Sequence, residues 1–236
     1  MSGLEGRTAL VTGGSRGIGL EVGRLLVAQG THVLLVARDE HRLRRAGQAV
    51  GAQWQVADVT DASALQRLGQ QAAEQLGGMP DIVVNSAGAF ELAPIVQTSA
   101  ESFDRQIAVN LRAVFLLART FLPAMLERGR GDFVTIGSVA GRQAFAANGA
   151  YAASKFGVRG LHGVLQAELR GTGVRATLIE PTATDTELWL AIDRERHPQL
   201  PDRDQMLRPE AVAGAVLFAL SQPEHTVVSN VLVDRG

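Results

Sequence analysis

The chain has 236 residues, of which 46% are apolar and 20% are charged, and its formal net charge is −1. This length suits one large α/β domain over residues 1–236 with a sizeable buried core, and the near-neutral charge argues against nucleic-acid binding. The absence of Cys excludes disulfides, zinc–thiolate sites and redox thiols, and the chain shows neither a transmembrane-length apolar run nor a signal-peptide pattern, so we expect a cytoplasmic protein without a membrane segment.

Apolar runs alternate with amphipathic segments along the whole chain. We predict strands at 7–13, 31–37, 53–58, 81–88, 132–138, 174–180 and 227–233. We predict helices at 17–30, 39–50, about 61–76, 99–128 with a break before Asn110, about 148–171, and 208–221. The strands are apolar throughout, which is typical of a parallel sheet covered by helices on both faces. The expected fold is a doubly wound α/β Rossmann fold with a seven-stranded, mainly parallel sheet, whose ligands lie at the carboxyl ends of the strands.

The first predicted strand leads directly into "TGGSRGIG", residues 12–19. Glycine permits a tight turn and a close approach to a pyrophosphate, and the following helix N-terminus supplies free N–H groups. The spacing differs from the commoner G-x-G-x-x-G, and a glycine-rich turn that binds nothing is the alternative. Its place between the first strand and the first helix favours a dinucleotide site. The predicted cofactor-binding residues of this loop are Gly13, Ser15, Arg16, Gly17, Ile18 and Gly19.

The stretch "GAYAASKFG", residues 149–157, holds the only Tyr and the only Lys of the chain. Tyr151 and Lys155 are four residues apart on a predicted helix, so their side chains can converge. An ammonium beside a phenol favours the phenolate, so we expect Lys155 to lower the pKa of Tyr151 and to make the pair a proton donor. Ser138, at the end of the fifth strand, can hold a substrate carbonyl oxygen. The alternative is a packed Tyr and a capping Ser.

Together these motifs resemble the short-chain dehydrogenase/reductase family over essentially the whole chain. The loop at 12–19 is similar to the cofactor loop of that family, "DVT" at 58–60 to its adenine-side motif, and "NSAG" at 85–88 to its fourth-strand motif. The resemblance implies that Lys155 also binds the ribose and that Asn110 carries a water. The implied catalytic tetrad is Asn110, Ser138, Tyr151 and Lys155. The further implied cofactor contacts are Asp58, Val59, Asn85, Ala87, Gly88, Tyr151, Lys155, Pro181 and Thr186.

Two residues depart from the family pattern. Ser86 stands where the family usually has Asn, and Thr182 stands where it usually has Gly after the proline. A β-branched residue at 182 constrains the backbone at that point.

The end of the second predicted strand, "LLVARDE", bears on the choice of cofactor. Ala37 stands where the NAD-dependent members of the family carry an acidic residue that accepts from the ribose 2′-hydroxyl. Arg38 and Arg16 can both offer paired N–H donors to a 2′-phosphate, so NADP(H) is predicted over NAD(H). The alternatives are that both arginines face solvent, or that Asp39 binds the ribose.

These features favour an NADP(H)-dependent carbonyl reductase or alcohol dehydrogenase. The rival within this class is a 3-oxoacyl-[acyl-carrier-protein] reductase, for which Arg128 and Arg130 offer a basic patch. A rival of another class is an NADP(H)-sensing protein without turnover, but such proteins typically lose the Tyr or the Lys, and both are present here. The five His show no ligand spacing, so no metal is predicted.

Residues 182–207 are predicted to form a substrate lid because they open with an apolar segment and continue as a charged loop that contains proline. The predicted pocket residues beneath the lid are Phe90, Glu91, Arg142 and Phe145, which suit an apolar or aromatic ketone. The family resemblance makes the helices at 110–128 and 148–171 the expected interface of a homodimer or homotetramer. Gly157, Gly160 and Gly163 recur on the second helix, where we expect close packing on the sheet or on a partner helix.

Overall fold

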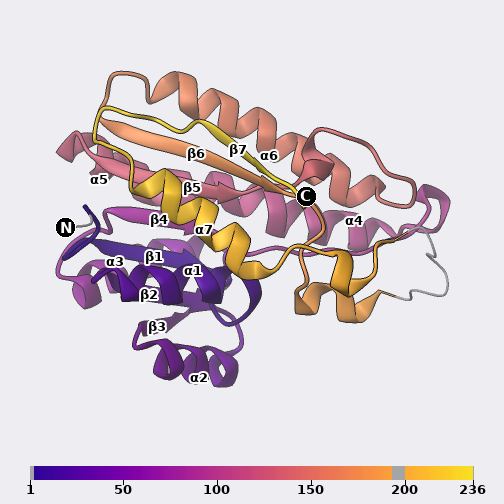
Figure 1. Cartoon of the computed structure of the whole chain (residues 1–236), viewed down its shortest axis with the longest axis horizontal. Coiled ribbons are helices and arrows are strands. Elements are labelled where there is room, and N and C mark those ends of the chain that lie inside the picture. Colours follow the sequence, from indigo (N-terminus) through magenta and orange to yellow (C-terminus); the bar gives the residue numbers. More distant parts are fainter. Residues whose placement is uncertain (1–2, 193–199, 236) are drawn as a thin grey trace.

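A computed structural model describes residues 3–192 and 200–235, and its strands form one twisted sheet (Figure 1). The strands are β1 (Thr8–Thr12), β2 (His32–Ala37), β3 (Gln53–Val56), β4 (Ile82–Asn85), β5 (Gly131–Ile136), β6 (Val174–Pro181) and β7 (Asn230–Val233). Their order is β3-β2-β1-β4-β5-β6-β7, and every pairing among them is parallel. The predicted Rossmann fold is confirmed, and its sheet is parallel throughout rather than mainly parallel. The order reverses between β1 and β4, which is where ligands bind in such sheets.

In the described ranges, seven α-helices lie between the strands. They are α1 (Gly17–Ala28), α2 (Glu40–Val50), α3 (Ala62–Leu76), α4 (Ala100–Ile107), α5 (Ala113–Arg128), α6 (Gly149–Glu168) and α7 (Pro209–Leu220). Local signals set several of their ends. Asp39 accepts a hydrogen bond from the Arg42 N–H at the start of α2, and Asp61 does the same for Ser63 at the start of α3. Gly51 ends α2 at a φ of 76°, a left-handed conformation that glycine adopts without strain.

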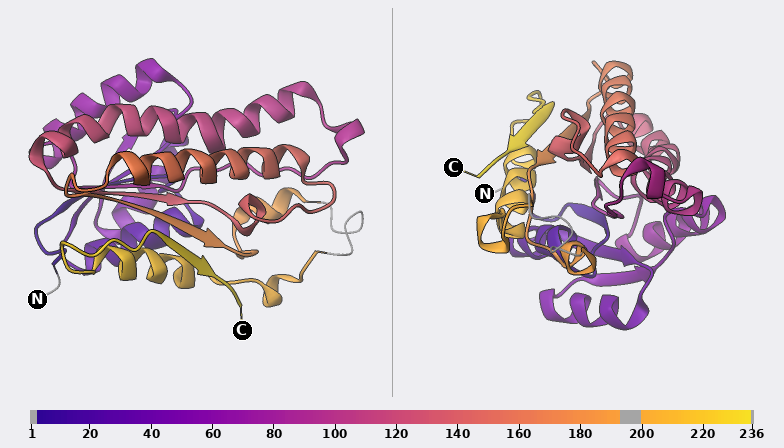
Figure 2. Two further views of the ribbon diagram at one scale, coloured as in Figure 1. Left: turned by 90° about the horizontal axis from the view of Figure 1, so that it is seen from above. Right: turned by 90° about the vertical axis from the view of Figure 1, so that its right-hand side faces the viewer.

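Alternate residues of β1, β2, β4, β5 and β6 enter two separate cores. Leu10 of β1 packs with residues of α3, α5 and α6, whereas Ala9 and Val11 pack with residues of α1, α2 and α7. A strand buried on both faces needs apolar residues at consecutive positions, which explains the continuous apolar runs of the sequence. Figure 2 (left) shows α5 and α6 on one side of the sheet and α7 on the other.

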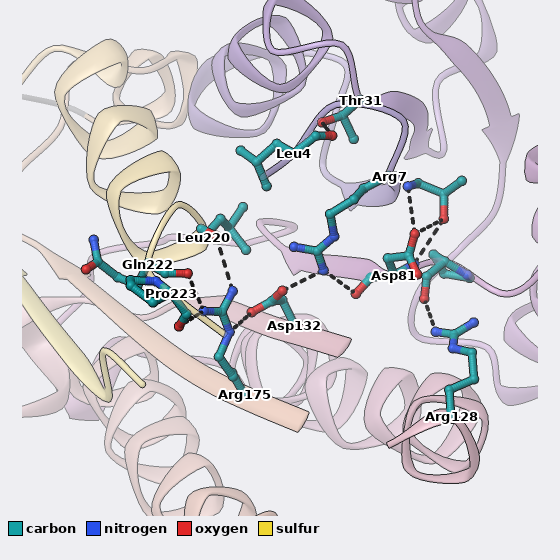
Figure 3. Close-up of polar contacts among 12 residues, drawn as sticks. Leu4, Arg7, Thr31, Asp81, Arg128, Asp132, Arg175, Leu220, Gln222 and Pro223 are labelled. Atoms are coloured by element: carbon teal, nitrogen blue, oxygen red, sulfur yellow. Dashed lines mark hydrogen bonds and ion pairs between the residues drawn. The ribbon is translucent and has the colours of Figure 1, made fainter. Parts of the chain in front are cut away.

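A polar network closes the amino ends of the central strands (Figure 3). The buried carboxylate of Asp132, in β5, accepts a 2.7 Å hydrogen bond from Arg7 and another of 2.7 Å from Arg175. Arg175, in β6, also donates to the carbonyls of Leu220 and Gln222 just after α7. These contacts tie β5, β6 and the segment before β1 to the end of α7, so the opposite edge of the sheet is left for a binding site.

The predicted break before Asn110 is confirmed as a π-helical turn, Ala108–Arg112, between α4 and α5. The helical stretch Ala100–Arg128 that contains this turn is long and apolar enough, by length and composition alone, to cross a membrane. The prediction that no apolar run reaches transmembrane length was therefore wrong for this helical stretch. In the fold, buried residues of α5 such as Phe121 and Met125 pack into one of the two cores, and this burial explains the apolar composition.

The last predicted strand, 227–233, is shorter in the structure. β7 begins at Asn230, where it pairs with Leu178 of β6, and the three residues before it lie outside the strand. Of the predicted lid, residues 193–199 lie outside the described residues. Its described parts are two short 3₁₀ turns, Glu187–Ala191 and Arg203–Gln205.

Candidate active site

A cleft of about 1110 Å³ lies along the carboxyl ends of the strands, bounded by the loops after β1, β2, β4, β5 and β6. All the predicted catalytic and cofactor-binding residues line this cleft except Asn85 and Asn110. The predicted residues therefore come together in one cleft at the predicted edge of the sheet.

The glycine-rich loop forms a close cradle at one part of the cleft. A Cβ atom on Gly13, which has a φ of +67°, would lie 2.8 Å from the backbone nitrogen of Ala87. A Cβ atom on Gly19 would lie 2.5 Å from the carbonyl oxygen of Gly13. Neither position therefore admits a side chain. α1 begins within this loop at Gly17, and Arg16 before it makes no side-chain hydrogen bond to the first turn. The loop and the helix N-terminus thus fit a pyrophosphate.

Three arginines line the cleft where it meets β2 and α2. Arg16 and Arg38 were predicted, whereas Arg42, in the first turn of α2, was missed. The stretch "ARDEHR" could have indicated Arg42 as a site residue, because α2 starts at the same strand end as Arg38. Asp39 is engaged as the cap of α2, and its second oxygen lies 3.3 Å from Arg42. Asp58 accepts from the backbone N–H and hydroxyl of Thr60, so its carboxylate holds the turn that follows β3.

Ser138, Tyr151 and Lys155 converge at the other part of the cleft, as predicted. Ser138 lies two residues after the end of β5, and its hydroxyl oxygen accepts from the Ala140 N–H at 3.1 Å. The hydroxyl of Ser138 lies close enough to that of Tyr151 to favour the phenolate. Lys155 lies one turn after Tyr151 on α6, with its Nζ 5.6 Å from the centre of the Tyr151 ring. The Nζ donates a 2.9 Å hydrogen bond to the carbonyl of Ile136.

The predicted lowering of the Tyr151 pKa is wrong for this structure. Burial raises the pKa of Tyr151 to about 12, and the nearby Ser138 hydroxyl opposes this effect only in part. Burial also lowers the pKa of Lys155 to about 8. Desolvation of the charged form therefore outweighs the attraction between ammonium and phenolate. At neutral pH Tyr151 carries its proton and Lys155 its charge, which suits the pair to proton donation.

Asn110 does not reach the cleft. Its Oδ1 accepts from the Ala89 N–H at 2.8 Å, and its Nδ2 donates to the Ala89 carbonyl and to the Ser154 hydroxyl, both at 2.9 Å. These bonds occupy both N–H groups, so the side chain joins the loop after β4 to α6 rather than holding a water in the cleft. Buried Asn85 likewise donates to the Val134 carbonyl at 3.3 Å, which joins β4 to β5.

The substrate side of the cleft is aromatic. Phe90 makes edge-to-face contacts with Tyr151, at 4.8 Å between ring centres, and with Trp189, at 5.1 Å. Phe145 and Leu188 also line this part. Offset aromatic contacts of this kind add to the energy of burying the rings. The wall beside the Tyr151 hydroxyl is therefore apolar.

Two charged residues predicted for this pocket have partners elsewhere. Glu91 accepts from the hydroxyl of Ser102 at 2.6 Å and pairs with Arg105. Arg142 donates to the buried carboxylate of Glu180 through its Nε at 2.8 Å and through a second nitrogen at 2.5 Å. Neither lines the cleft, so their placement in the pocket was wrong.

Thr182 causes no strain in the backbone. It lines the cleft without a positive φ, and its N–H donates to the Val233 carbonyl at 3.0 Å. Thr186 lines the cleft beside the glycine loop, where a Cβ atom on Gly17 would be 3.2 Å from its methyl group. Thr182 in place of the usual glycine therefore leaves the backbone beside the cleft unstrained.

The family model described as short chain dehydrogenase matches residues 7–197. The chain is 35% identical over 239 residues to glycine betaine reductase ATRR of Emericella nidulans, a match that covers 98% of this chain but 19% of that longer protein. It is also 32% identical over 236 residues to an uncharacterised oxidoreductase of Staphylococcus aureus (strain USA300), with 99% of each chain covered.

Three solved structures share the fold. A metagenomic short-chain oxidoreductase in complex with NADP has a TM-score of 0.84 and 32% identity, over 99% of this chain and 98% of that one. The closed form of serine dehydrogenase complexed with NADP⁺ has a TM-score of 0.89 and 30% identity, over 96% and 94%. A candidate betaketoacyl-ACP reductase has a TM-score of 0.84 and 33% identity, over 99% and 98%. The fold, the cleft and these matches agree, and the chain belongs to the short-chain dehydrogenase/reductase family of oxidoreductases.

Proposed function

We propose that this oxidoreductase uses NADP(H) to interconvert an apolar or aromatic ketone and the corresponding secondary alcohol. One observation carries the proposal. The hydroxyls of Ser138 and Tyr151 lie close together, with Lys155 one helical turn away, beneath an aromatic wall in a cleft that continues to a glycine cradle. A proton donor, a carbonyl-binding hydroxyl and a dinucleotide site thus share one cavity.

Ser138, Tyr151 and Lys155 have different roles in the proposed reaction. The bound cofactor supplies a hydride to the carbonyl carbon. Ser138 donates a hydrogen bond to the carbonyl oxygen and orients it. Tyr151 transfers its proton to that oxygen, which completes the alcohol, and the positive charge of Lys155 stabilises the phenolate that remains. In the oxidation direction Tyr151 takes the proton back. The aromatic wall keeps water from the reacting atoms.

The preference for NADP(H) is supported by the arginines at the end of β2 and in the glycine loop. Arg16, Arg38 and Arg42 line the same part of the cleft, and Ala37 replaces the acidic residue that would favour NAD(H). Guanidinium groups match the geometry of phosphate oxygens. Two of the similar solved structures carry NADP or NADP⁺, which agrees with this assignment.

The carrier-protein alternative is not favoured by the position of Arg128. Its guanidinium donates to the carbonyls of Met79 and Pro80, just before β4, at 2.6 and 2.9 Å. Arg128 lies near Asp81, which directly precedes β4 (Figure 3), whereas the cleft lies at the carboxyl ends of the strands. An acidic carrier protein bound there would hold its thioester away from Tyr151.

The proposed assembly is a homodimer or homotetramer through α5 and α6. Phe115 on α5 and Phe156 and Val164 on α6 are 45–53% exposed. A Cβ atom on Gly160 or Gly163 would meet open space, so a partner helix can approach closely there. Gly157 has a different role, because a Cβ atom at this position would lie 2.7 Å from Leu111. Light scattering of the purified protein tests the proposal, and a monomer at micromolar concentration would contradict it.

Turnover on a ketone panel tests the enzymatic proposal. The purified protein is incubated with NADPH and aromatic ketones, small diketones, sugars or acyl thioesters, and the absorbance of the reduced nicotinamide is followed. We expect the highest kcat/KM on aromatic or apolar ketones. Preference for acyl thioesters would support the carrier-protein alternative. Tight NADPH binding without turnover on any ketone would support a sensor and contradict the proposal.

A further inference from the structure

Glu187 bridges two arginines of the cleft. It opens the 3₁₀ turn Glu187–Ala191 directly after Thr186, whereas Arg16 precedes α1 and Arg42 belongs to α2. One oxygen of the Glu187 carboxylate, Oε2, lies 3.0 Å from a terminal nitrogen of Arg16 and 2.7 Å from one of Arg42. All three residues line the cleft. The hydrogen bond from Arg16 lowers the pKa of Glu187, with a smaller contribution from Arg42, so the group is an anion at neutral pH.

The contacts of Glu187 are those that a bound phosphate would require. A single anionic oxygen accepts from two guanidiniums, which is how arginine pairs bind phosphate groups. A 2′-phosphate that reached these nitrogens would bring a second negative charge against the carboxylate. Like charges at hydrogen-bond distance repel, so the carboxylate and the phosphate cannot both hold the pair.

Glu187 is the carboxylate of this cluster that is free to move away. Among the residues that the structure describes, three carboxylates face the arginines: Glu187, Asp58 at 3.9 Å from Arg38, and Asp39 at 3.3 Å from Arg42. Asp39 caps α2, and Asp58 accepts a backbone N–H at the turn after β3, so displacement of either would break local structure. Glu187 is held through its two guanidinium contacts, and its side chain is 44% exposed.

We infer that Glu187 is a built-in competitor for the cofactor 2′-phosphate at Arg16 and Arg42, and that it sets how strongly the enzyme discriminates between NADPH and NADH. The inference rests on the proposed NADP(H) specificity. NADPH displaces the carboxylate and thereby releases the first turn of the lid, whereas NADH lacks the 2′-phosphate and leaves the carboxylate in place. Trp189, two residues later in the same turn, contacts Phe90. Displacement of Glu187 from the two arginines therefore also shifts Trp189 in the aromatic wall of the substrate pocket.

Binding of cofactor fragments tests the inference without turnover. Adenosine 2′,5′-bisphosphate carries the 2′-phosphate and AMP does not, and isothermal titration calorimetry measures both dissociation constants. Glu187→Gln should bind the bisphosphate about two- to tenfold more tightly than the wild type, the range expected for loss of two exposed ion pairs. Its affinity for AMP should change less than about twofold. Glu21→Gln is the matched control, because it removes the same charge from an exposed pair with Arg24 on α1, and it should change neither affinity.

A second set of variants shows whether the effect of Glu187→Gln on bisphosphate affinity depends on Arg16 and Arg42. In a chain that carries Arg16→Ala and Arg42→Ala, Glu187→Gln should leave bisphosphate affinity unchanged. An equal gain in that background would overturn the inference, because it would reflect net charge alone. Unchanged or weaker bisphosphate binding by Glu187→Gln in the wild-type background would also overturn it. This outcome is distinct from failure of the proposed cofactor, in which neither wild type nor Glu187→Gln prefers the bisphosphate to AMP. A preference that only Glu187→Gln shows would support the inference.

Discussion

The Glu180 carboxylate offers a test of how the fold holds the catalytic loop. Glu180 lies near the end of β6, and its side chain is 1% exposed. It accepts from Arg142, in the segment between Ser138 and Tyr151, and from Arg159 of α6 at 2.7 and 3.1 Å. Its Cγ also lies 3.3 Å from the position a Cβ atom would take on Gly137, next to Ser138. We expect Glu180→Gln to loosen the Ser138 loop.

The size of the effect follows from the burial of the partners. Removal of one member of a buried ion pair costs roughly 3–5 kcal/mol when the remaining charge stays buried. Arg142 and Arg159 are 37% and 38% exposed, so water can solvate them again, and a Gln oxygen still accepts a hydrogen bond. We therefore expect a loss of roughly 1–3 kcal/mol in the free energy of unfolding. For a chain of this size the Tm falls by roughly 2–12 °C.

The assay pairs thermal unfolding with ketone reduction, and Asp132→Asn is the matched control. Asp132 is a second buried carboxylate with two arginine partners, but it lies at the amino ends of the strands (Figure 3). Both variants should lose Tm, and Asp132→Asn should lose at least as much, because its partners Arg7 and Arg175 are only 24% and 10% exposed. Only Glu180→Gln should lose kcat, by about tenfold, because small displacements of a positioning group are costly for orientation, while its NADPH dissociation constant changes little. A destabilised Glu180→Gln enzyme with wild-type kcat would refute the argument.

Three further predictions concern the reacting groups. Tyr151→Phe should lower kcat by at least roughly 10²–10⁴-fold with unchanged NADPH affinity, and a variant with most of the wild-type kcat would exclude Tyr151 as the acid. The wild type should favour NADPH over NADH by at least about tenfold in kcat/KM, and Arg38→Asp should reduce or reverse this ratio; equal use of NADH by the wild type would show that the arginines do not bind the phosphate. Ketone reduction should fall as pH rises through about 8, the lowered pKa of Lys155, because the cation that stabilises the phenolate is then lost. Alcohol oxidation should rise over the same interval, since the pair must hold one proton fewer to accept one, and flat pH–rate profiles would contradict this assignment.

The parts of the site that the sequence predicted depend on local order along the chain. Ser138 follows a buried strand, and Tyr151 and Lys155 lie one turn apart on one helix. Parallel strands bring their carboxyl ends to one edge, so strand-end residues meet without any knowledge of side-chain directions. The glycine loop was predictable for the same reason.

The parts that the sequence did not predict depend on contacts between distant elements. Arg42 and Glu187 are 145 residues apart, and no local pattern pairs them. Arg142 is close in sequence to Ser138, but its side chain turns to Glu180 of β6. The error in the Tyr151 pKa has the same origin, because the sequence gives the neighbouring cation but not the burial that outweighs it.

These contacts explain why position 155 carries a lysine and not an arginine. Every other basic side chain of the Lys or Arg type in the sequence is an arginine. In the described structure, Asp132, Glu180 and Glu187 each accept hydrogen bonds from two guanidiniums, whose several N–H donors suit such bridging contacts. An arginine keeps its charge at every pH at which proteins fold. In the proposed reaction, position 155 needs a group that carries charge at neutral pH yet can release a proton before the pair accepts one in the oxidation direction. Burial brings the pKa of Lys155 to about 8, within reach of that task, and an arginine buried at the same place would hold the phenolate but could not share its proton.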